Sequence, residues 1–313
     1  MKKISWNGIE IEVTRRCQLK CAHCIRGDAQ NIDISNETID ILLDNTAMFG
    51  EVLFTGGEPT LNIEGMRYFL EQLKQRKIPL IYLNIVTNGY EASEQFVEIV
   101  KEYYQYMFSQ GADYDEKELF IRIGISQDRY HTDNAKNFAW YQEQLKGIAE
   151  VTAKTTGNVP YKMGRARALK EALYTPKPVT HKIAVMEKGK IPNCECREEH
   201  ELLYDEQVIV MCYVLLTAKG ELLETVFNEY DEYSDNDMIC KLSKDSMIYE
   251  QLSSFNEGIS GACNYLCGES VNKYESFAKM FLGLQRYADV TKMDTGKAFK
   301  DFLKGYGLLN GET

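Results

Sequence analysis

The sequence predicts an α/β fold with a mainly parallel sheet, followed by a smaller second domain. Stretches rich in β-branched residues alternate with amphipathic helical stretches through the first half of the chain. Glycines or polar residues follow each expected strand, and 313 residues exceed one ordinary domain. Strands that alternate with helices need crossover connections, which give a parallel sheet, either open or rolled into a barrel.

The expected elements can be placed in order along the chain. The first strand is the alternating stretch IEIEVT at 9–14, and a helix follows over 35–50 with Ser35 or Asn36 as its N-cap. The next elements, in order, are a strand at 51–57, a helix at 63–77, a strand at 79–89, a helix at 93–108, a strand at 119–126, a helix at 134–153 and a strand at 208–216.

Polar or conformationally special residues follow the first four strands. Parallel α/β sheets carry their active sites at the carboxyl ends of the strands, so these residues are expected to converge on one rim. They are three cysteines after the first strand, Gly56, Gly57, Glu58 and Pro59 after the second, Thr87, Asn88 and Gly89 after the third, and Ser126, Asp128, Tyr130 and His131 after the fourth.

Composition limits the partners, the compartment and the role of the cysteines that can be expected. The formal charge is −11, from 36 basic and 47 acidic residues, and the basic residues form no long run, which argues against a nucleic-acid partner. The chain has no signal-peptide pattern and no apolar stretch of about 18 residues, so we expect a cytoplasmic protein without a membrane partner. In that reducing compartment the nine cysteines are candidates for metal binding or catalysis rather than disulfides.

The segment RRCQLKCAHCIRG, 15–27, concentrates the chemistry. Cys17, Cys21 and Cys24 are soft ligands, which select zinc, copper(I) or an iron–sulfur cluster. A structural zinc site needs a fourth ligand, and the nearby candidate, His23, is adjacent to Cys24 and poorly placed to turn toward the same ion. A cubane cluster held by three cysteines keeps one iron open to an exogenous ligand. Taken alone, these residues are compatible with either a zinc ion or an iron–sulfur cluster.

The spacing of these cysteines resembles the signature of the radical S-adenosylmethionine (SAM) superfamily. Its three cysteines are spaced CxxxCxxC with an aromatic residue before the last, as Cys17, Cys21, His23 and Cys24 are here. The resemblance implies a partial (β/α)6 barrel, a 4Fe-4S cluster, SAM as cofactor and an external electron donor of the flavodoxin or ferredoxin type. It further implies an enzyme that cleaves SAM to a 5′-deoxyadenosyl radical, which abstracts a substrate hydrogen.

Two further segments resemble the same superfamily. FTGGEPTL at 54–61 is similar to the turn that contacts the methionine ammonium of SAM, and VTNG at 86–89 to the end of the third strand. The resemblance therefore assigns cofactor contacts to His23 in the cysteine segment and to Gly56, Gly57, Glu58, Pro59, Thr87 and Asn88. Taken alone, each segment is equally an ordinary polar turn after a strand.

The fourth strand end and a later basic segment add candidates. GISQDRYH at 124–131 resembles a family motif in which a polar side chain reaches the SAM ribose, with Ser126 first and Asp128 second for that role. Either residue could instead cap a helix. His131 is a candidate proton carrier or simply a packed side chain. MGRARAL at 163–169 resembles a segment of the peptide-modifying branch, with Arg165 or Arg167 able to pair with a carboxylate, or merely exposed.

The six remaining cysteines lie in the last 120 residues or so. This enrichment resembles the SPASM and twitch extensions of peptide-modifying radical SAM enzymes, which carry auxiliary iron–sulfur clusters. The pattern departs from the family because Thr225 stands where a cysteine is expected, and because these residues contain no CxxC pair. The candidate ligands of an auxiliary cluster or a zinc ion are Cys194, Cys196, Cys263 and Cys267. Cys212 is expected in a core strand instead.

These observations predict a radical SAM barrel over 1–180 and a cysteine-bearing α+β domain over 181–313. The expected function is modification of a ribosomally made peptide, recognised by the C-terminal half or a separate protein because only 16 residues precede Cys17. The alternatives are chemistry on a small molecule or nucleotide, activation of a glycyl-radical protein, and, outside enzymes, a zinc-stabilised binding module.

Overall fold

The computed structural model describes residues 3–110, 120–131, 135–154, 164–170, 185–186, 208–223, 238–246 and 248–255. Their strands form one sheet with the order β5-β4-β3-β2-β1-β7-β8-β9, and β6 pairs with β7. The pairs from β5 to β1, and the pair of β1 with β7, are parallel, while β6, β8 and β9 join antiparallel. Among the described strands β5 and β9 are the two ends of this order, so the mainly parallel sheet is open, in keeping with a partial barrel.

The strands are β1 (Ile4–Thr14), β2 (Thr46–Gly56), β3 (Leu80–Thr87), β4 (Ile121–Ser126), β5 (Glu150–Lys154), β6 (Val185–Met186), β7 (Val208–Leu216), β8 (Glu221–Leu223) and β9 (Met238–Lys241). The α-helices are α1 (Asn36–Asp44), α2 (Ile63–Arg76), α3 (Glu94–Ser109), α4 (Ala135–Gln144) and α6 (Ile248–Phe255). Two short 3₁₀ helices are η1 (Pro59–Leu61) and η2 (Gly164–Ala168). None of the helices within the described ranges is long and apolar enough to cross a membrane.

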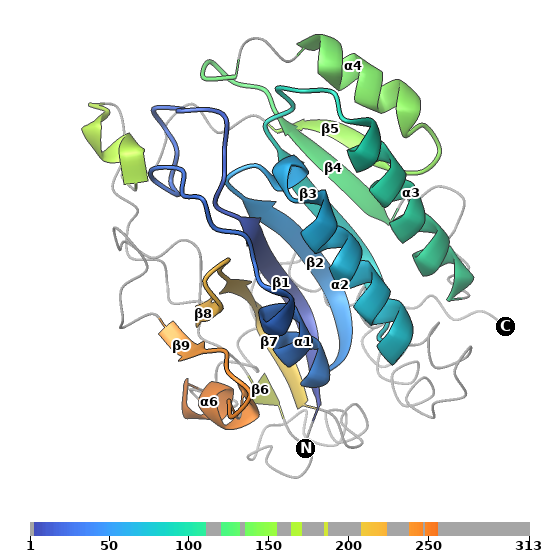
Figure 1. Cartoon of the computed structure of the whole chain (residues 1–313), viewed down its shortest axis with the longest axis vertical. Coiled ribbons are helices and arrows are strands. Elements are labelled where there is room, and N and C mark those ends of the chain that lie inside the picture. The colour runs from blue at the N-terminus through green and yellow to red at the C-terminus, as the bar shows by residue number, and fades with distance from the viewer. Residues whose placement is uncertain are drawn as a thin grey trace, which may run out of the picture.

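Helices α1, α2 and α3 lie side by side over one face of the sheet (Figure 1). The layer between them and the strands is apolar and fully buried. Phe54 of β2 packs its ring edge-on against Phe69 of α2, with ring centroids 5.4 Å apart, and lies 5.8 Å from the ring of Tyr103 of α3. Ser35 and Ser93 cap α1 and α3, each accepting from a backbone N–H in the first turn. The core thereby fixes the strand ends on which the site is built.

Two expected helices proved too long, because each runs into a strand of the sheet. The helix expected over 35–50 ends at Asp44, where the Asn45 side chain donates to the carbonyl of Ile41, and β2 begins at Thr46. The helix expected over 134–153 ends at Gln144, and β5 occupies the last part of that range. In both places the ladder with a neighbouring parallel strand outweighs the local helical pattern. The other expected elements are confirmed to within a few residues, apart from the first strand, which begins earlier, at Ile4, and the strand expected at 51–57, which begins five residues early.

The strand expected at 208–216 is present as β7, and it carries Cys212. It lies parallel to β1 in the same sheet, so the sheet continues past the domain boundary expected at residue 180. That boundary stays a prediction, since most of 181–313 lies outside the described residues.

Candidate active site at the carboxyl ends of the strands

The four expected clusters converge on one rim of the sheet. β1, β2, β3 and β4 are consecutive neighbours, so the segments that follow them lie together. Backbone hydrogen bonds join the first two, since the N–H of Gly57 donates to Thr14 (2.8 Å) and that of Glu58 to Arg16 (2.8 Å). The cysteine loop also reaches the third and fourth clusters through the contacts described below.

The cysteine loop leaves β1 and holds three free thiols. Cys17, Cys21 and Cys24 are all partly exposed. The Cys17 sulfur accepts from the N–H of Leu19 at 3.4 Å, and the Asn88 amide lies 3.9 Å from the same sulfur. The loop therefore presents its sulfurs toward the rim instead of packing them into the core.

The electrostatics of these thiols disfavour free thiolates. Burial raises the pKa of Cys17, and burial with the two neighbouring cysteines raises the pKa of Cys21 to about 11. Three thiolates in one loop need a compensating cation, which a metal centre supplies.

The separation of the sulfurs bears on which metal fits. Ligands of one zinc ion, with bonds of about 2.3 Å, lie about 3.8 Å apart. Within the described part of the chain, the three sulfurs do not all lie within 4.8 Å of one another. Their donor chemistry and spread fit a polynuclear iron–sulfur cluster better than a single ion.

The glycine turn after β2 packs directly on the cysteine loop. Gly56 has a φ of +143°, and a Cβ at this position would lie 2.2 Å from the Thr14 carbonyl oxygen. A Cβ on Gly57 would lie 2.2 Å from the carbonyl oxygen of Arg16. Only glycine allows this approach, so the turn and the loop are held at backbone contact. Pro59 follows as the first residue of η1 and is buried.

Glu58 is the buried hub of the rim, with 1% of its surface exposed. Its Oε1 accepts from the Thr60 N–H (3.1 Å), the Thr60 hydroxyl (2.7 Å) and the Thr87 hydroxyl (2.6 Å). Its Oε2 accepts from the Asn88 N–H at 2.7 Å. Burial raises the pKa of this carboxyl, while these hydrogen bonds act in the opposite direction. Glu58 therefore ties the end of β2 to the end of β3.

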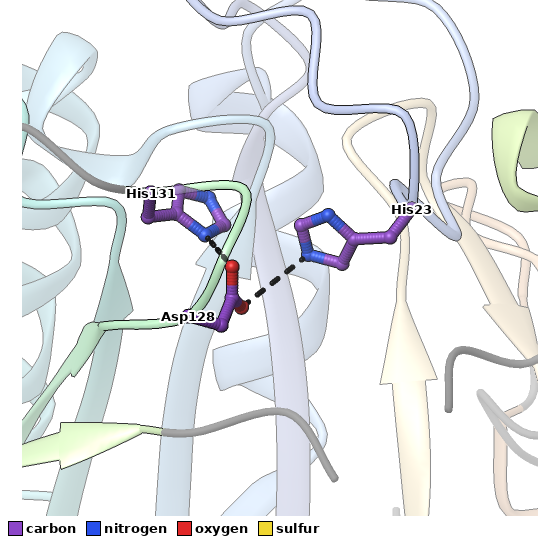
Figure 2. Close-up of side chains that lie close together, drawn as sticks. All are labelled: His23, Asp128 and His131. Atoms are coloured by element: carbon purple, nitrogen blue, oxygen red, sulfur yellow. Dashed lines mark hydrogen bonds and ion pairs between the residues drawn. The ribbon is translucent and has the colours of Figure 1, made fainter. Parts of the chain in front are cut away.

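The loop after β4 brings Asp128 and His131 against the cysteine loop. Asp128 Oδ1 lies 2.9 Å from His131 Nδ1 and accepts from the Tyr130 N–H at 2.8 Å. His131 Nε2 lies 3.4 Å from the Cys21 sulfur. Figure 2 shows His23, from the cysteine loop, facing the same carboxylate, with its Nε2 3.7 Å from Oδ2.

His23 itself is held by aromatic contacts. Its ring stacks on Tyr130, with centroids 4.2 Å apart, and meets His131 edge-on. Burial lowers the pKa of His23, and its Nδ1 is buried without a hydrogen-bond partner among the described residues. Ser126, the last residue of β4, lies at the same rim.

Comparison with known proteins identifies this arrangement. Residues 11–151, which span β1 to the start of β5, match the family model described as the radical SAM superfamily. Residues 11–151 are a radical SAM domain. Proteins with this domain are enzymes, and the matched region contains the cysteine loop, the glycine turn and the ends of β3 and β4.

Individual proteins resemble this chain more loosely. Fe-coproporphyrin III synthase of Methanosarcina barkeri is 42% identical over 64 residues, which are 18% of this chain and 14% of that protein. The solved structure of native anSMEcpe with bound AdoMet and Cp18Cys peptide is 13% identical with a TM-score of 0.44, covering 98% of this chain and all of that one. Streptococcus suis SuiB bound to precursor peptide SuiA is 13% identical with a TM-score of 0.39, covering 73% and 64%. Neither structure reaches a TM-score of 0.5, so neither is informative about the activity.

Arg165, in η2, binds the cysteine loop of the radical SAM domain. Its N–H donates to the Cys24 carbonyl (3.0 Å), its Nε to the Cys21 carbonyl (3.0 Å), and its guanidinium pairs with Asp28 (3.0 Å). Gly164, with φ +49°, packs so closely that a Cβ would lie 2.5 Å from the Cys24 carbonyl oxygen. The side chain expected to bind a carboxylate of SAM or substrate thus holds the cysteine loop in this structure.

Sequence patterns missed two of these roles. The contact of His131 with Cys21 joins positions 110 residues apart, and only the DRYH ending of the motif hinted at it. Gly164 carried no signal beyond its place in MGRARAL.

The proposed auxiliary ligands Cys194, Cys196, Cys263 and Cys267 lie outside the described residues. Cys240 of β9 is a half-buried free thiol, and burial raises its pKa to about 11.

Proposed function

We propose that the radical SAM domain holds a 4Fe-4S cluster with Cys17, Cys21 and Cys24 and uses it to cleave SAM. The observation that carries the proposal is the cysteine loop itself. Three partly exposed free thiols lie on one rim, and their sulfurs do not all lie within 4.8 Å of one another. Beside them, the glycine turn packs so closely that a Cβ on Gly56 or Gly57 would clash with the cysteine loop. When bound, the cluster supplies the electron that splits the SAM sulfonium and yields a radical able to abstract a substrate hydrogen.

The chain's own residues would bind and orient these groups. Asn88 lies between the Glu58 carboxylate and the Cys17 sulfur, so it links the SAM-facing turn to the cluster loop. The carbonyls of Gly56 and Gly57, with the charge of Glu58 behind them, form the acceptor for the methionine ammonium. Ser126, at the end of β4, is the candidate for the ribose. Asp128 is less suited to that role because its carboxylate already faces two histidines.

We propose a ribosomally made peptide as the substrate and a flavodoxin- or ferredoxin-type protein as the electron donor. The support for the peptide is the likeness of MGRARAL and of the cysteine-bearing last third to peptide-modifying enzymes. In this structure Gly164 and Arg165 of that segment bind the cluster loop, which would connect substrate binding to the cluster.

A second candidate is chemistry on a small molecule. It is favoured by the 42% identity over 64 residues to a protein named Fe-coproporphyrin III synthase. That match spans 14% of the relative, so it does not transfer the activity of the whole protein.

The experiment is anaerobic purification followed by reduction in the presence of SAM. The wild-type protein should be brown, contain iron and sulfide, and form 5′-deoxyadenosine. Replacement of Cys17, Cys21 and Cys24 together by alanine should abolish the product, and undiminished cleavage in that variant would refute the proposal. A colourless protein with about one zinc per chain would point to the binding-module alternative.

The substrate is tested separately, by mass spectrometry of a short peptide encoded beside this protein and co-expressed with it. A mass change with the wild-type enzyme that is absent with the triple cysteine variant supports the peptide. Product formation from SAM without any change in the peptide favours the small-molecule candidate.

A further inference from the structure

The side chains of His23, Asp128 and His131 form a compact group of potential metal ligands beside the three cysteines (Figure 2). Each offers one ligand atom, and these atoms all lie within 4.8 Å of one another. The exposed fractions of the three side chains are 12%, 8% and 7%. They come from two segments far apart in sequence, the cysteine loop and the loop after β4, and all three point to one spot.

The distances suit ligands of one ion. Two ligand atoms around an ion with bonds of about 2.1 Å lie about 3.0–3.4 Å apart, for octahedral and tetrahedral angles respectively. His131 Nδ1 is 2.9 Å from Asp128 Oδ1, and His23 Nε2 is 3.7 Å from Asp128 Oδ2. These two distances end on different oxygens of Asp128, so the carboxylate would hold the ion between the two rings, and all the ligand atoms lie within 4.8 Å of one another.

The chemistry of the set is specific. Two imidazoles and one carboxylate form the ligand triad that binds iron(II) with open positions, and manganese(II) and zinc(II) accept the same donors. A thiolate-rich site, by contrast, selects zinc or iron–sulfur clusters. The cluster is therefore chemically distinct from the three cysteines beside it.

The second nitrogen of His131 is placed compatibly with this role. An ion on Nδ1 leaves the ring proton on Nε2, and Nε2 lies 3.4 Å from the Cys21 sulfur. That N–H would donate to the thiolate, which is the kind of outer hydrogen bond that metal-bound histidines usually make.

We propose that His23, Asp128 and His131 form a mononuclear site for a divalent first-row transition ion, placed directly beside the radical SAM cysteine loop. The ion keeps coordination positions that the protein does not fill, so it can bind an anionic oxygen of a ligand entering the rim. Through His131 it also adds positive charge next to Cys21. Binding of the ion itself requires neither the cluster nor a particular substrate, whereas its effect on Cys21 rests on the proposed function.

The test titrates Mn²⁺ into the full-length, anaerobically reconstituted protein after removal of loose metal by a chelator. Manganese is the probe because it avoids thiolates and is visible by electron paramagnetic resonance. Wild-type protein should bind about one Mn²⁺ per chain. Asp128→Asn and His131→Ala should each weaken Mn²⁺ binding at least about tenfold, because even the loss of a residue that only hydrogen-bonds to a metal ligand usually has an effect of that size. The iron content of both variants should remain about four per chain.

Asp44→Asn is the matched control. Asp44 is an exposed carboxylate that pairs with Arg76 on the helix layer, and its loss should leave Mn²⁺ binding unaltered. Absence of saturable binding to the wild type, or equal binding by Asp128→Asn, overturns the proposal.

A second measurement does not depend on the variants folding. In the wild type, reduction of the cluster should broaden the spectrum of bound Mn²⁺, because His131 would join the ion to a cluster ligand. A spectrum that reduction leaves unchanged places the ion elsewhere and refutes the site. The number of Mn²⁺ ions bound per chain is also measured on protein without an iron–sulfur cluster. Failure of the protein to load a cluster therefore does not decide whether the proposed metal site exists.

Discussion

Glu58→Gln tests whether the buried hub of the rim depends on a charged carboxylate. The two oxygens of Glu58 accept four hydrogen bonds, three at Oε1 and one at Oε2. Glutamine has one oxygen, and its NH₂ group must face a donor whichever way the amide turns. If the oxygen serves Thr60 and Thr87, the NH₂ opposes the Asn88 N–H.

The size of the effect follows from burial. Glu58 is 1% exposed, so water cannot replace the lost acceptor. A buried donor left without a partner costs about 1–3 kcal/mol, and a hydrogen bond to a charged group contributes about 1.5–3 kcal/mol. We therefore expect the free energy of unfolding to fall by about 2 kcal/mol, which lowers the Tm by about 3 °C for a protein of this size.

The assay is urea unfolding followed by circular dichroism. The control is Glu71→Gln, an exposed glutamate of α2, which should change stability by less than about 0.5 kcal/mol. A Glu58→Gln protein as stable as the control would refute the role of the carboxylate as the hub.

The same variant also tests the SAM contact. Loss of the charge should weaken SAM binding about ten- to a hundredfold while iron content is unchanged. Thr60→Val separates the two roles, because it removes one hydroxyl donor to Glu58 without altering the charge. It should lower stability by about 1 kcal/mol and leave the Kd for SAM nearly unaltered. Equal losses of SAM affinity in both variants would show that the charge itself is unimportant.

Three further predictions concern the turn, the loop and alkaline pH. Gly57→Ala places a Cβ 2.2 Å from the Arg16 carbonyl oxygen and should lower the free energy of unfolding by more than about 1–3 kcal/mol. In the control Gly147→Ala no atom lies near the new Cβ, so only the strain of a left-handed alanine backbone should lower the stability. Equal thermal shifts in the two variants would contradict this prediction. Arg165→Met removes the side-chain bond to the Cys21 carbonyl and should speed amide hydrogen exchange in residues 21–28, and unchanged protection would exclude a clamp. Burial raises the pKa of Tyr141 to about 12, so its contribution is complete below about pH 10 and is lost as the pH rises toward 12. The stability difference between wild type and Tyr141→Phe should shrink by up to about 2.7 kcal/mol over that range, and a constant difference would refute the shift.

The sequence alone determined the kind of fold and most of the rim. Period-two and helical patterns are local, so they located β1 to β4 and α1 to α3, and the Cys17 to Cys24 spacing is a local property of one loop. Once the strands are known to be parallel, the convergence of their carboxyl ends follows from topology, and the contacts of Glu58 with Thr87 and Asn88 confirm it.

Tertiary structure decided what depends on partners distant in the chain. Thr46 to Gly50 and Glu150 to Ala153 carry helical patterns, but they lie in strands because neighbouring strands offer complete ladders on the sheet. The pairing of β7 with β1 joins residues about 200 apart, which no local signal encodes. The clamp of Arg165 on the cysteine loop and the meeting of His23, Asp128 and His131 have the same origin. Their side-chain chemistry is written in the sequence, but the folded chain alone brings these groups within bonding distance.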